Sequence, residues 1–436
     1  MASADVVRVG LLGCGNVGGA LVDVVDHDGA AIAARTGVHL EITRIAVRNV
    51  ARARVPALAP DRLTHDAAAL AVDPEIDVVV ELIGGIEPAR GLVVDALRAG
   101  KPVVTANKEL LANFGEELYR AAEEGGSALY CEAAVGGAIP LLRALRVSLA
   151  GEPIKRVMGI VNGTTNYILS RMSEERISYA EALAEAERLG YAERDPSADV
   201  EGFDASAKAA ILASIAFNTE VVAGDVYREG IETIDVADID FASRLGYAVK
   251  LLAVAEDTTP AGAAQKTIGV RVHPAMVPLE HPLAGVRGAF NAVFVEGEHA
   301  GELMFYGRGA GGRPTASAVL GDLLDAARSA RLGPLPPRPP VQKVEIRPID
   351  ELHAQYYLTI DVADRPGVLS AVASLFGEHG VSIRSMEQVG LAAEARLVFI
   401  THLAREADIQ ATLAGLRELD AVERIGGLLR VIGPEH

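Results

Sequence analysis

The segment around Lys208 holds the residue types best suited to chemistry. It is rich in carboxylates and is interrupted by Gly and Pro; its five acidic residues between 191 and 208 are Glu193, Asp195, Asp199, Glu201 and Asp204. A run of acids is most often a solvated face, but Gly and Pro breaks are typical of a shaped loop. Asp204 and Lys208 are four residues apart, so they share one face of a helix. The helix beyond reads KAAILASIAF, which predicts burial.

A lysine that enters a buried helix is rare unless it is paired. We therefore expect an ion pair between Asp204 and Lys208. Because a partly buried lysine can titrate, Lys208 is the candidate for exchanging a proton with a substrate oxygen.

A glycine turn near the start of the chain predicts a dinucleotide site. Residues 13–18, with Gly13, Gly15, Asn16, Val17 and Gly18, fit G-x-G-x-x-G directly after the apolar strand 6–12 and before a helix over about 17–25. The first glycine permits the turn, the second lets the pyrophosphate approach, and the third lets helix and strand pack closely. The N–H groups of the helix N-terminus would receive the anion. The alternative is an ordinary tight turn.

Two later strand ends add candidate cofactor residues. Arg48 stands where NAD binders usually carry an acid, and a guanidinium suits the 2′-phosphate of NADP. Thr105 and Lys108 follow another strand, where open α/β sheets bind ligands, and Lys108 would face phosphate, nicotinamide or substrate. The alternatives are a solvated arginine and a helix N-terminal lysine with no ligand.

The elements that position these residues follow a βαβ rhythm. Strands over 39–47, 77–83 and 102–107, a helix over 88–99 and a strand-like run over 128–135 predict an α/β domain with a Rossmann-type parallel sheet. We assign it to residues 1–135, completed by 307–330, where a glycine loop with Gly309 runs into a long helix. Residues 136–306, with helices over 178–189 and 204–217 and strands over 268–274 and 292–297, read as an α+β catalytic and dimerisation domain.

A proline-rich stretch separates this body from a tail. Six prolines over 334–348 favour an extended connector, which we assign to 331–349. Strand and helix signals in residues 350–436 follow the order β-α-β-β-α-β, which predicts a ferredoxin-like sandwich.

Composition narrows the functional class. The net charge of −18 argues against nucleic acid or an anionic membrane as a partner. Two cysteines exclude a disulfide framework and favour a reduced, cytoplasmic setting, and no segment reads as a targeting signal or as an apolar span long enough to cross a bilayer. These bounds predict a soluble, multidomain, metabolic protein. The ten histidines form no spaced ligand pairs, so we expect them to be surface or core residues and not metal ligands.

Taken together, these motifs resemble the homoserine dehydrogenase family over essentially the whole chain. The resemblance rests on the glycine turn, TANK (105–108), CEAAVGGAIP (131–140), NGTTNYIL (162–169), the acid-rich run 186–208 and a tail that is similar to a regulatory ACT domain. It implies reversible, NAD(P)H-dependent reduction of L-aspartate 4-semialdehyde to L-homoserine, in threonine, methionine and isoleucine biosynthesis. The alternatives are another NAD(P) dehydrogenase of a semialdehyde or hydroxy acid, and a regulator that binds dinucleotide without turnover. The Asp204–Lys208 pair favours an enzyme over a sensor.

The resemblance also implies roles for single residues. It makes Lys208 the acid/base and Asp204 its partner, and it puts Gly190 and Gly309 at the cofactor. Substrate contacts would come from the acids that suit an α-ammonium and from the donors that suit a carboxylate: Glu193, Asp199, Asn162, Gly163 and Thr164.

Two further sites follow from the resemblance. A monovalent cation, Na⁺ or K⁺, would bind Glu132 and the carbonyls of Val135, Gly137 and Ile139, although a glycine-rich turn with a capping glutamate is an alternative. In the tail, paired ACT domains of a homodimer or homotetramer would bind an amino acid effector, with threonine the candidate. The matching residues are Asp364, Gly367, Val368, Leu369 and Ser382, where Ser382 replaces a frequent Asn. The alternative is a dimerisation domain with no ligand.

Overall fold

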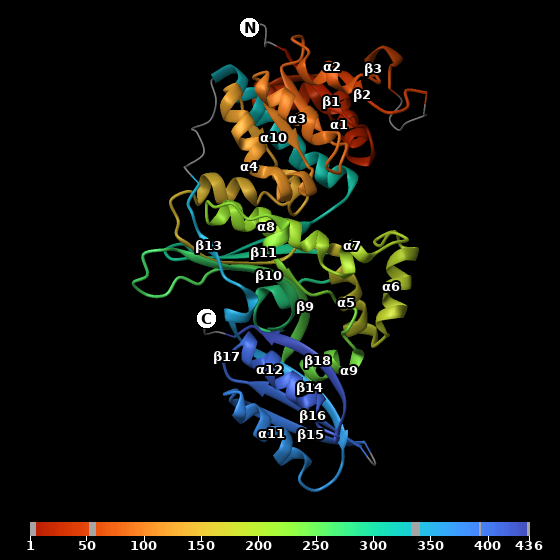
Figure 1. Cartoon of the computed structure of the whole chain (residues 1–436). Helices are drawn as coiled ribbons and strands as arrows, with labels where there is room; N and C mark the ends of the chain where they lie inside the picture. The colour runs from red at the N-terminus through yellow and green to blue at the C-terminus, as the bar shows by residue number, and fades with distance from the viewer. Residues whose placement is uncertain (1–5, 52–57, 333–340, 392–393, 434–436) are drawn as a thin grey trace. The chain divides into compact units, whose positions relative to one another are not determined.

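The computed structural model describes residues 6–51, 58–332, 341–391 and 394–433 (Figure 1). The chain forms two compact units, each built from three stretches: 1–154, 210–225 and 297–343 in the first, and 155–209, 226–296 and 344–436 in the second. Residues 333–340 of the predicted proline-rich connector lie outside the described residues. Within the described part of the chain, no helix is long and apolar enough to cross a membrane.

The first unit contains the predicted parallel sheet. Its strand order is β3-β2-β1-β4-β5-β6, and every neighbouring pair is parallel, which is the Rossmann arrangement. The strands are β1 (Val6–Leu12), β2 (His39–Ala46), β3 (Leu63–Thr64), β4 (Val78–Glu81), β5 (Val103–Thr105) and β6 (Leu129–Tyr130). The order reverses beside β1, so the glycine turn that follows this strand lies at the switch point.

Helices cover this sheet. They are α1 (Asn16–Thr36), α2 (Ala67–Val72), α3 (Ala89–Arg98), α4 (Lys108–Gly125) and α10 (Gly312–Leu332). Apolar residues of α1 and α10 share one buried cluster with the strands, so the late helix completes this core as predicted. The helix α1 is longer than predicted, since it continues through residues 26–36 and ends at Gly37 in the left-handed conformation. The strand predicted over 128–135 was too long: β6 ends at Tyr130, and a 3₁₀ turn follows at Glu132–Ala134. Also in this unit are the 3₁₀ turns Pro60–Arg62 and Ala223–Asp225, the π-helix Ala144–Ser148 and β12 (Gly301–Arg308).

The second unit begins with an α+β layer. Its strands β7 (Ile154–Ile160), β9 (Tyr247–Asp257), β10 (Thr267–Pro278) and β11 (Phe290–Gly297) lie in the order β11-β7-β9-β10, with short β8 (Tyr227–Arg228) and β13 (Glu345–Ile346) added beside β10. The helices are α5 (Gly163–Glu175), α6 (Tyr179–Arg188), α7 (Ser197–Val200), α8 (Phe203–Ala216) and α9 (Val236–Arg244), with a 3₁₀ turn at Pro282–Gly285. Nearly every residue of β10 is buried, because both faces of the strand are covered.

The tail forms the predicted βαββαβ sandwich. Its elements are β14 (His353–Ala363), α11 (Val368–Glu378), β15 (Ile383–Leu391), β16 (Glu394–Thr401), α12 (Glu406–Arg417) and β18 (Val422–Val431), with an additional short β17 (Ala404–Arg405) and a 3₁₀ turn at Ile349–Glu351. The antiparallel order is β18-β14-β16-β15, and α11 and α12 share a core with one sheet face (Figure 1). The edge strand β18 also pairs in parallel with β10, so the two sheets of this unit are continuous. The sequence did not predict this connection.

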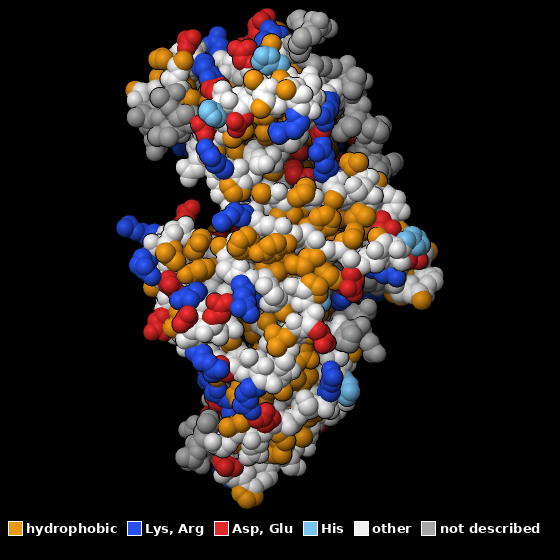
Figure 2. Space-filling model, turned by 180° about the vertical axis from the view of Figure 1, so that it is seen from behind, with side chains coloured by type: hydrophobic (Ala, Val, Ile, Leu, Met, Phe, Trp, Pro, Cys, Tyr) orange, Lys and Arg blue, Asp and Glu red, His pale blue; other side chains and the backbone are white. Residues whose placement is uncertain are grey.

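Charge is mixed on the face of the molecule that Figure 2 shows. Lys and Arg side chains lie among Asp and Glu side chains there, so the net charge of −18 does not take the form of one acidic patch on that face.

Candidate functional site

The glycine turn has the geometry that a bound pyrophosphate requires. Gly13 has φ +92°, and a Cβ there would lie 2.7 Å from the Leu82 carbonyl oxygen. At Gly18 a Cβ would lie 2.7 Å from the Gly13 oxygen, whereas at Gly15 nothing lies within 4 Å. Two glycines are therefore needed for the turn and for close packing, and the third leaves open space at the N-terminus of α1. Asn16 and Val17 begin that helix.

A buried carboxylate next to this turn escaped the sequence interpretation. Glu81 is fully buried at the end of β4 and accepts hydrogen bonds from the Ile83 and Gly84 N–H groups and from the Thr105 hydroxyl (2.6 Å). Asn107 accepts from the Leu110 N–H and donates to the Gly85 carbonyl. The Thr105 hydroxyl is thus occupied by Glu81, and the network fixes the loops after β4 and β5. An acid that ends a buried strand before two glycines was the available signal.

The other predicted cofactor residues of the first unit are distributed around the same strand ends. Arg48 is exposed two residues after β2, whose last residue, Ala46, accepts a hydrogen bond from the Gly13 N–H. Lys108 is half-buried at the first position of α4. A Cβ at Gly312 would lie 3.1 Å from the Asn16 oxygen, so the glycine loop that contains Gly309 approaches the start of α1.

Four side chains of the second unit form a cluster, in which Asn162 and Asp204 are buried and Lys208 and Asp199 are partly exposed. The Lys208 Nζ donates to Asp204 Oδ2 (2.6 Å) and to the Val161 carbonyl (2.7 Å), which confirms the predicted ion pair. The side chains of the pair are 12% and 9% exposed. The Asn162 amide donates to Asp199 (2.6 Å) and to Asp204 (2.8 Å). Asn162 therefore holds the two acids together beside the lysine, and two of the three ammonium N–H groups have acceptors among the described residues.

The NGTTN motif forms the start of α5. Asn162 caps the helix by accepting from the Thr165 N–H, and a Cβ at Gly163 would lie 2.9 Å from the Ala289 oxygen. The Thr164 hydroxyl donates to the Tyr191 carbonyl, next to Gly190, which has φ +76°. The threonine hydroxyl is thereby used within the protein. The N–H groups of Gly163 and Thr164, which precede the capped Thr165 N–H, are the donors that this helix start offers to an anion.

The acidic residues of the run 186–208, called the acid loop below, fall into two groups. Asp199 and Asp204 join the cluster, whereas Glu193 is exposed and has no hydrogen bond to the cluster among the described residues. Asp195 accepts from the N–H and the hydroxyl of Ser197, which lowers the pKa of the carboxyl group. Asp195 is therefore a turn cap.

The predicted cation residues supply oxygen atoms, but several of these are already hydrogen-bonded. The Glu132 carboxylate accepts from the Leu142 and Arg143 N–H groups (2.8 and 2.7 Å), and the Ile139 carbonyl accepts from the Leu141 N–H. Gly137 has φ +56° and presses against Gly309, and Val135 is fully buried. Each of these oxygens keeps a second lone pair, so the set suits a hard cation.

A second carboxylate accompanies Glu132. Asp322 of α10 accepts from the Glu132 N–H (2.7 Å), and burial raises the pKa of Asp322 to about 7 and raises that of Glu132. Two buried carboxylates favour a positive charge or a proton nearby.

The predicted effector residues do not meet within one chain. Asp364, Gly367, Val368 and Leu369 follow the C-terminal end of β14, where Gly367 has φ +93° and begins α11. Ser382 precedes β15, and the strand registers put it at the opposite end of the sheet. A groove of about 430 Å³ lined by α12 and β18 includes none of these residues.

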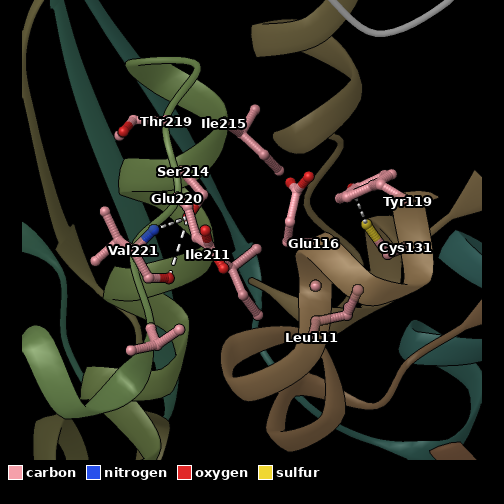
Figure 3. Close-up of a pocket in the computed structure, with 12 residues that line it drawn as sticks. Leu111, Glu116, Tyr119, Cys131, Ile211, Ser214, Ile215, Thr219, Glu220 and Val221 are labelled. Atoms are coloured by element: carbon pink, nitrogen blue, oxygen red, sulfur yellow. Dashed lines mark hydrogen bonds between the residues drawn. The ribbon is translucent and has the colours of Figure 1, made fainter. Parts of the chain in front are cut away.

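A cavity in the first unit is a poor candidate for the substrate site. It is lined by residues of α4 and of the stretch 211–222 (Figure 3) and encloses about 30 Å³, which is room for one or two waters. The Ser214 hydroxyl is occupied by the Val221 N–H and carbonyl, and the Tyr119 hydroxyl lies 3.8 Å from Cys131 Sγ. The cluster around Lys208 therefore remains the candidate catalytic centre.

Comparison with known proteins agrees with this arrangement. Family models described as homoserine dehydrogenase, homoserine dehydrogenase NAD binding domain and ACT domain match residues 140–324, 13–132 and 356–421. The homoserine dehydrogenase of Mycobacterium tuberculosis H37Rv is 50% identical over 435 residues, covering 98% of both chains.

Solved structures match as well. A homoserine dehydrogenase from Thiobacillus denitrificans has a TM-score of 0.91 at 40% identity over 98% of each chain. A hyperthermophilic archaeal homoserine dehydrogenase in complex with NADPH has a TM-score of 0.61 at 27% identity, over 77% of this chain and 100% of that one. The Lys208 cluster, the glycine turn and these whole-chain similarities together make this chain a member of the homoserine dehydrogenase family.

Proposed function

We propose that the chain interconverts L-aspartate 4-semialdehyde and L-homoserine, with Lys208 as the proton donor in the direction of reduction. The observation that carries this proposal is the hydrogen-bonded cluster of Lys208, Asp204, Asn162 and Asp199. A bound nicotinamide supplies the hydride that converts the aldehyde carbon to the alcohol carbon. The aldehyde oxygen then needs one proton, and Lys208 has an N–H that neither Asp204 nor Val161 uses.

Substrate binding follows from the charges of the same region. Asp199, with Glu193 from the adjoining loop, suits the α-ammonium group, while Asp204 holds Lys208 in place. The N–H groups of Gly163 and Thr164 at the start of α5, near Gly190, suit the substrate carboxylate. An exposed Glu193 is compatible with this role if it turns toward bound substrate.

The direct experiment measures NADPH oxidation with aspartate semialdehyde. Wild type is expected to turn over, and Lys208→Ala is expected to lose about 10²- to 10⁴-fold in kcat, since it lacks the proton donor. Glu193→Gln serves as the comparison, because it is expected to raise KM for the amino acid more than it lowers kcat. Undiminished turnover of Lys208→Ala would reject the assignment.

For the cofactor, we propose a preference for NADP(H) over NAD(H). The support is the exposed Arg48 beside the glycine turn, together with an NADPH-bound relative. Gly13, Gly15 and Gly18 would hold the pyrophosphate, with Thr105, Lys108 and Gly309 nearby contributors. Arg48→Ala is expected to raise KM for NADPH about tenfold and to leave KM for NADH unchanged, because one charge-assisted bond to phosphate is lost. An unchanged cofactor preference contradicts this.

We also propose a Na⁺ or K⁺ ion at Glu132 and the carbonyls of Val135, Gly137 and Ile139. The buried negative charge of Glu132 and Asp322 supports a cation there. Thermal unfolding in KCl, NaCl and choline chloride at equal ionic strength tests this: Tm is expected to be higher with the bound ion, and equal Tm values argue against it.

Regulation by threonine through the tail completes the proposal. Because Asp364 and Ser382 lie at opposite ends of one sheet, a site using both needs a second copy, which supports a homodimer. For these roles we propose a cofactor domain of residues 1–135 with 307–330, a catalytic domain of residues 136–306 and a regulatory domain of residues 350–436. Deletion of the tail would expose the edge of β10, so the point variant Ser382→Ala is the better probe. It is expected to weaken threonine inhibition, and a wild type that threonine does not inhibit would refute regulation.

A further inference from the structure

Arg430, on the last strand of the tail, lies in a buried ionic cluster beside the start of β14, whereas the predicted effector turn follows the end of that strand. Its side chain is 2% exposed, and Nη2 lies 2.8 Å from both Glu406 of α12 and Glu229 beside β8. The guanidinium lies 5.5 Å from the centre of the Tyr227 ring, and the Tyr227 hydroxyl donates to Glu229 (2.6 Å). Surrounding carboxylates raise the pKa of Arg430, so it stays charged.

Glu406 and Glu229 have different structural positions. Glu406 belongs to the tail itself, is 2% exposed and also accepts from the Tyr356 hydroxyl. Glu229 belongs to the α+β layer of the second unit, which holds the proposed catalytic cluster, and its N–H donates to the carbonyl of Val272 of β10. Arg430 thus connects Glu406 of the tail to Glu229 of the α+β layer, within one unit.

The backbone after Glu229 is pressed against the acid loop. The Ile231 N–H donates to the Val200 carbonyl (2.9 Å), and a Cβ at Gly230 would lie 2.4 Å from the same oxygen. A Cβ at Gly202, which has φ +83°, would lie 3.3 Å from the Glu229 oxygen. The Arg228 guanidinium stacks 3.6 Å from the Phe203 ring centre. Residues 228–231 therefore support both ends of the turn that separates Asp199 from Asp204.

We infer that Glu229, held by Arg430 of the tail, is a positioning residue for the substrate acids Asp199 and Asp204. Because the contacts at Val200 and Gly202 involve backbone atoms in close packing, a shift of residues 228–231 moves the 199–204 turn with it. The tail thereby helps to set the spacing of the two carboxylates that Asn162 joins. This inference rests on the proposed roles of Asp199 and Asp204.

Glu229→Gln is the variant of choice, since it removes one charge but leaves Arg430 neutralised by Glu406 and so preserves the fold. Its KM for homoserine is expected to rise about fivefold or more, while KM for NADP stays within about twofold, because the cofactor residues of the glycine turn are not attached to this network. Glu229→Asp, which keeps the charge, is expected to recover part of the loss.

Glu296→Gln is the matched control. Glu296 pairs with Arg156 (2.6 Å) in the same unit and is 23% exposed against 26% for Glu229, yet none of its described contacts is with the acid loop. If Glu229→Gln leaves KM for homoserine within about twofold of wild type, or if Glu296→Gln raises it equally, the inference is overturned. Asp199→Asn tests the proposed substrate site separately from the positioning role of Glu229. If this variant does not raise KM for homoserine, the proposed substrate site itself is wrong.

Discussion

Lys208, which is partly buried, and Lys250, which is buried, are two lysines of the second unit with different surroundings. Lys208 on α8 has a carboxylate partner, Asp204, at 2.6 Å. Lys250 on β9 is 4% exposed and donates to the Val286 carbonyl (2.5 Å) and the Asn166 side-chain oxygen (3.3 Å), and no described ion pair includes it. Burial lowers the pKa of Lys250 to about 8. A carboxylate thus accepts a hydrogen bond from the Lys208 ammonium, whereas both acceptors of the Lys250 ammonium are uncharged.

Each lysine is served by a different asparagine of α5. Asn162 donates to Asp199 and Asp204 on the Lys208 side. Asn166, one turn later, donates to the carbonyls of Gly288 and Phe290 and accepts from Lys250. The comparison teaches that burial of a lysine does not by itself identify a catalytic group. The acids around Lys208 make it the candidate catalytic lysine, while Lys250 donates a hydrogen bond to the backbone at Val286 and so has a structural role.

The largest expected difference between the lysines is in turnover. Lys208→Met should lower kcat about 10²- to 10⁴-fold, because a thioether donates no proton. Lys250→Met should keep kcat close to wild type, since its described contacts are with Asn166 and the Val286 carbonyl and not with the acid cluster. Steady-state rates with homoserine and NADP, measured on folded protein, check this. A comparable loss in both variants would mean that Lys250 also belongs to the catalytic machinery.

This distinction marks the limit of sequence reasoning. The Asp204–Lys208 pair was predictable, because both residues lie four apart at the start of an uncharged helix. The same reasoning overlooked Lys250, whose acceptor Val286 lies 36 residues later and is a backbone carbonyl, which no side-chain pattern encodes. Two of the donors to Glu81 are likewise main-chain N–H groups, so the only signal for it in the sequence was its position, at the end of a buried strand and before two glycines.

The fold was more predictable than the contacts. The parallel sheet and the βαββαβ tail follow from alternating periodicities and the glycine turn, all local signals. The parallel pairing of β18 with β10 depends on registers between strands about 150 residues apart and had no local signal. Likewise, Ser382 and Asp364 both match an effector motif, but only the strand registers put them at opposite ends of the sheet.

Stability against pH gives the second prediction. Between the folded pKa of Lys250, about 8, and its ordinary value of 10.5, the unfolded chain binds this proton and the folded chain does not. The free energy of unfolding should therefore rise with pH across this window, by a few kcal/mol from this group. Below pH 8 the folded protein bears the full free-energy cost of burying the charged Lys250 ammonium. Urea unfolding of wild type and Lys250→Met at pH 7, 8, 9 and 10 isolates the effect. Parallel curves for the two proteins would contradict a buried, charged Lys250.

The smallest expected effects come from the two asparagines, and they should differ in kind. Asn166→Ala should lower the free energy of unfolding by about 1–3 kcal/mol, because it removes the hydrogen bonds to the Gly288 and Phe290 carbonyls and one of the two acceptors of the Lys250 ammonium. KM for homoserine should hardly change. Asn162→Ala loses a helix cap worth about 1 kcal/mol, but it also lets Asp199 and Asp204 separate, so KM for homoserine should rise.

Measuring Tm and KM on both asparagine variants decides between two views of α5. If each variant changes mainly its own quantity, the helix carries two independent contacts one turn apart. If Asn166→Ala raises KM as much as Asn162→Ala does, the Lys250 side and the Lys208 side are coupled through the first turns of α5. The contrast between the two lysines would then describe two ends of one network rather than a structural and a catalytic group.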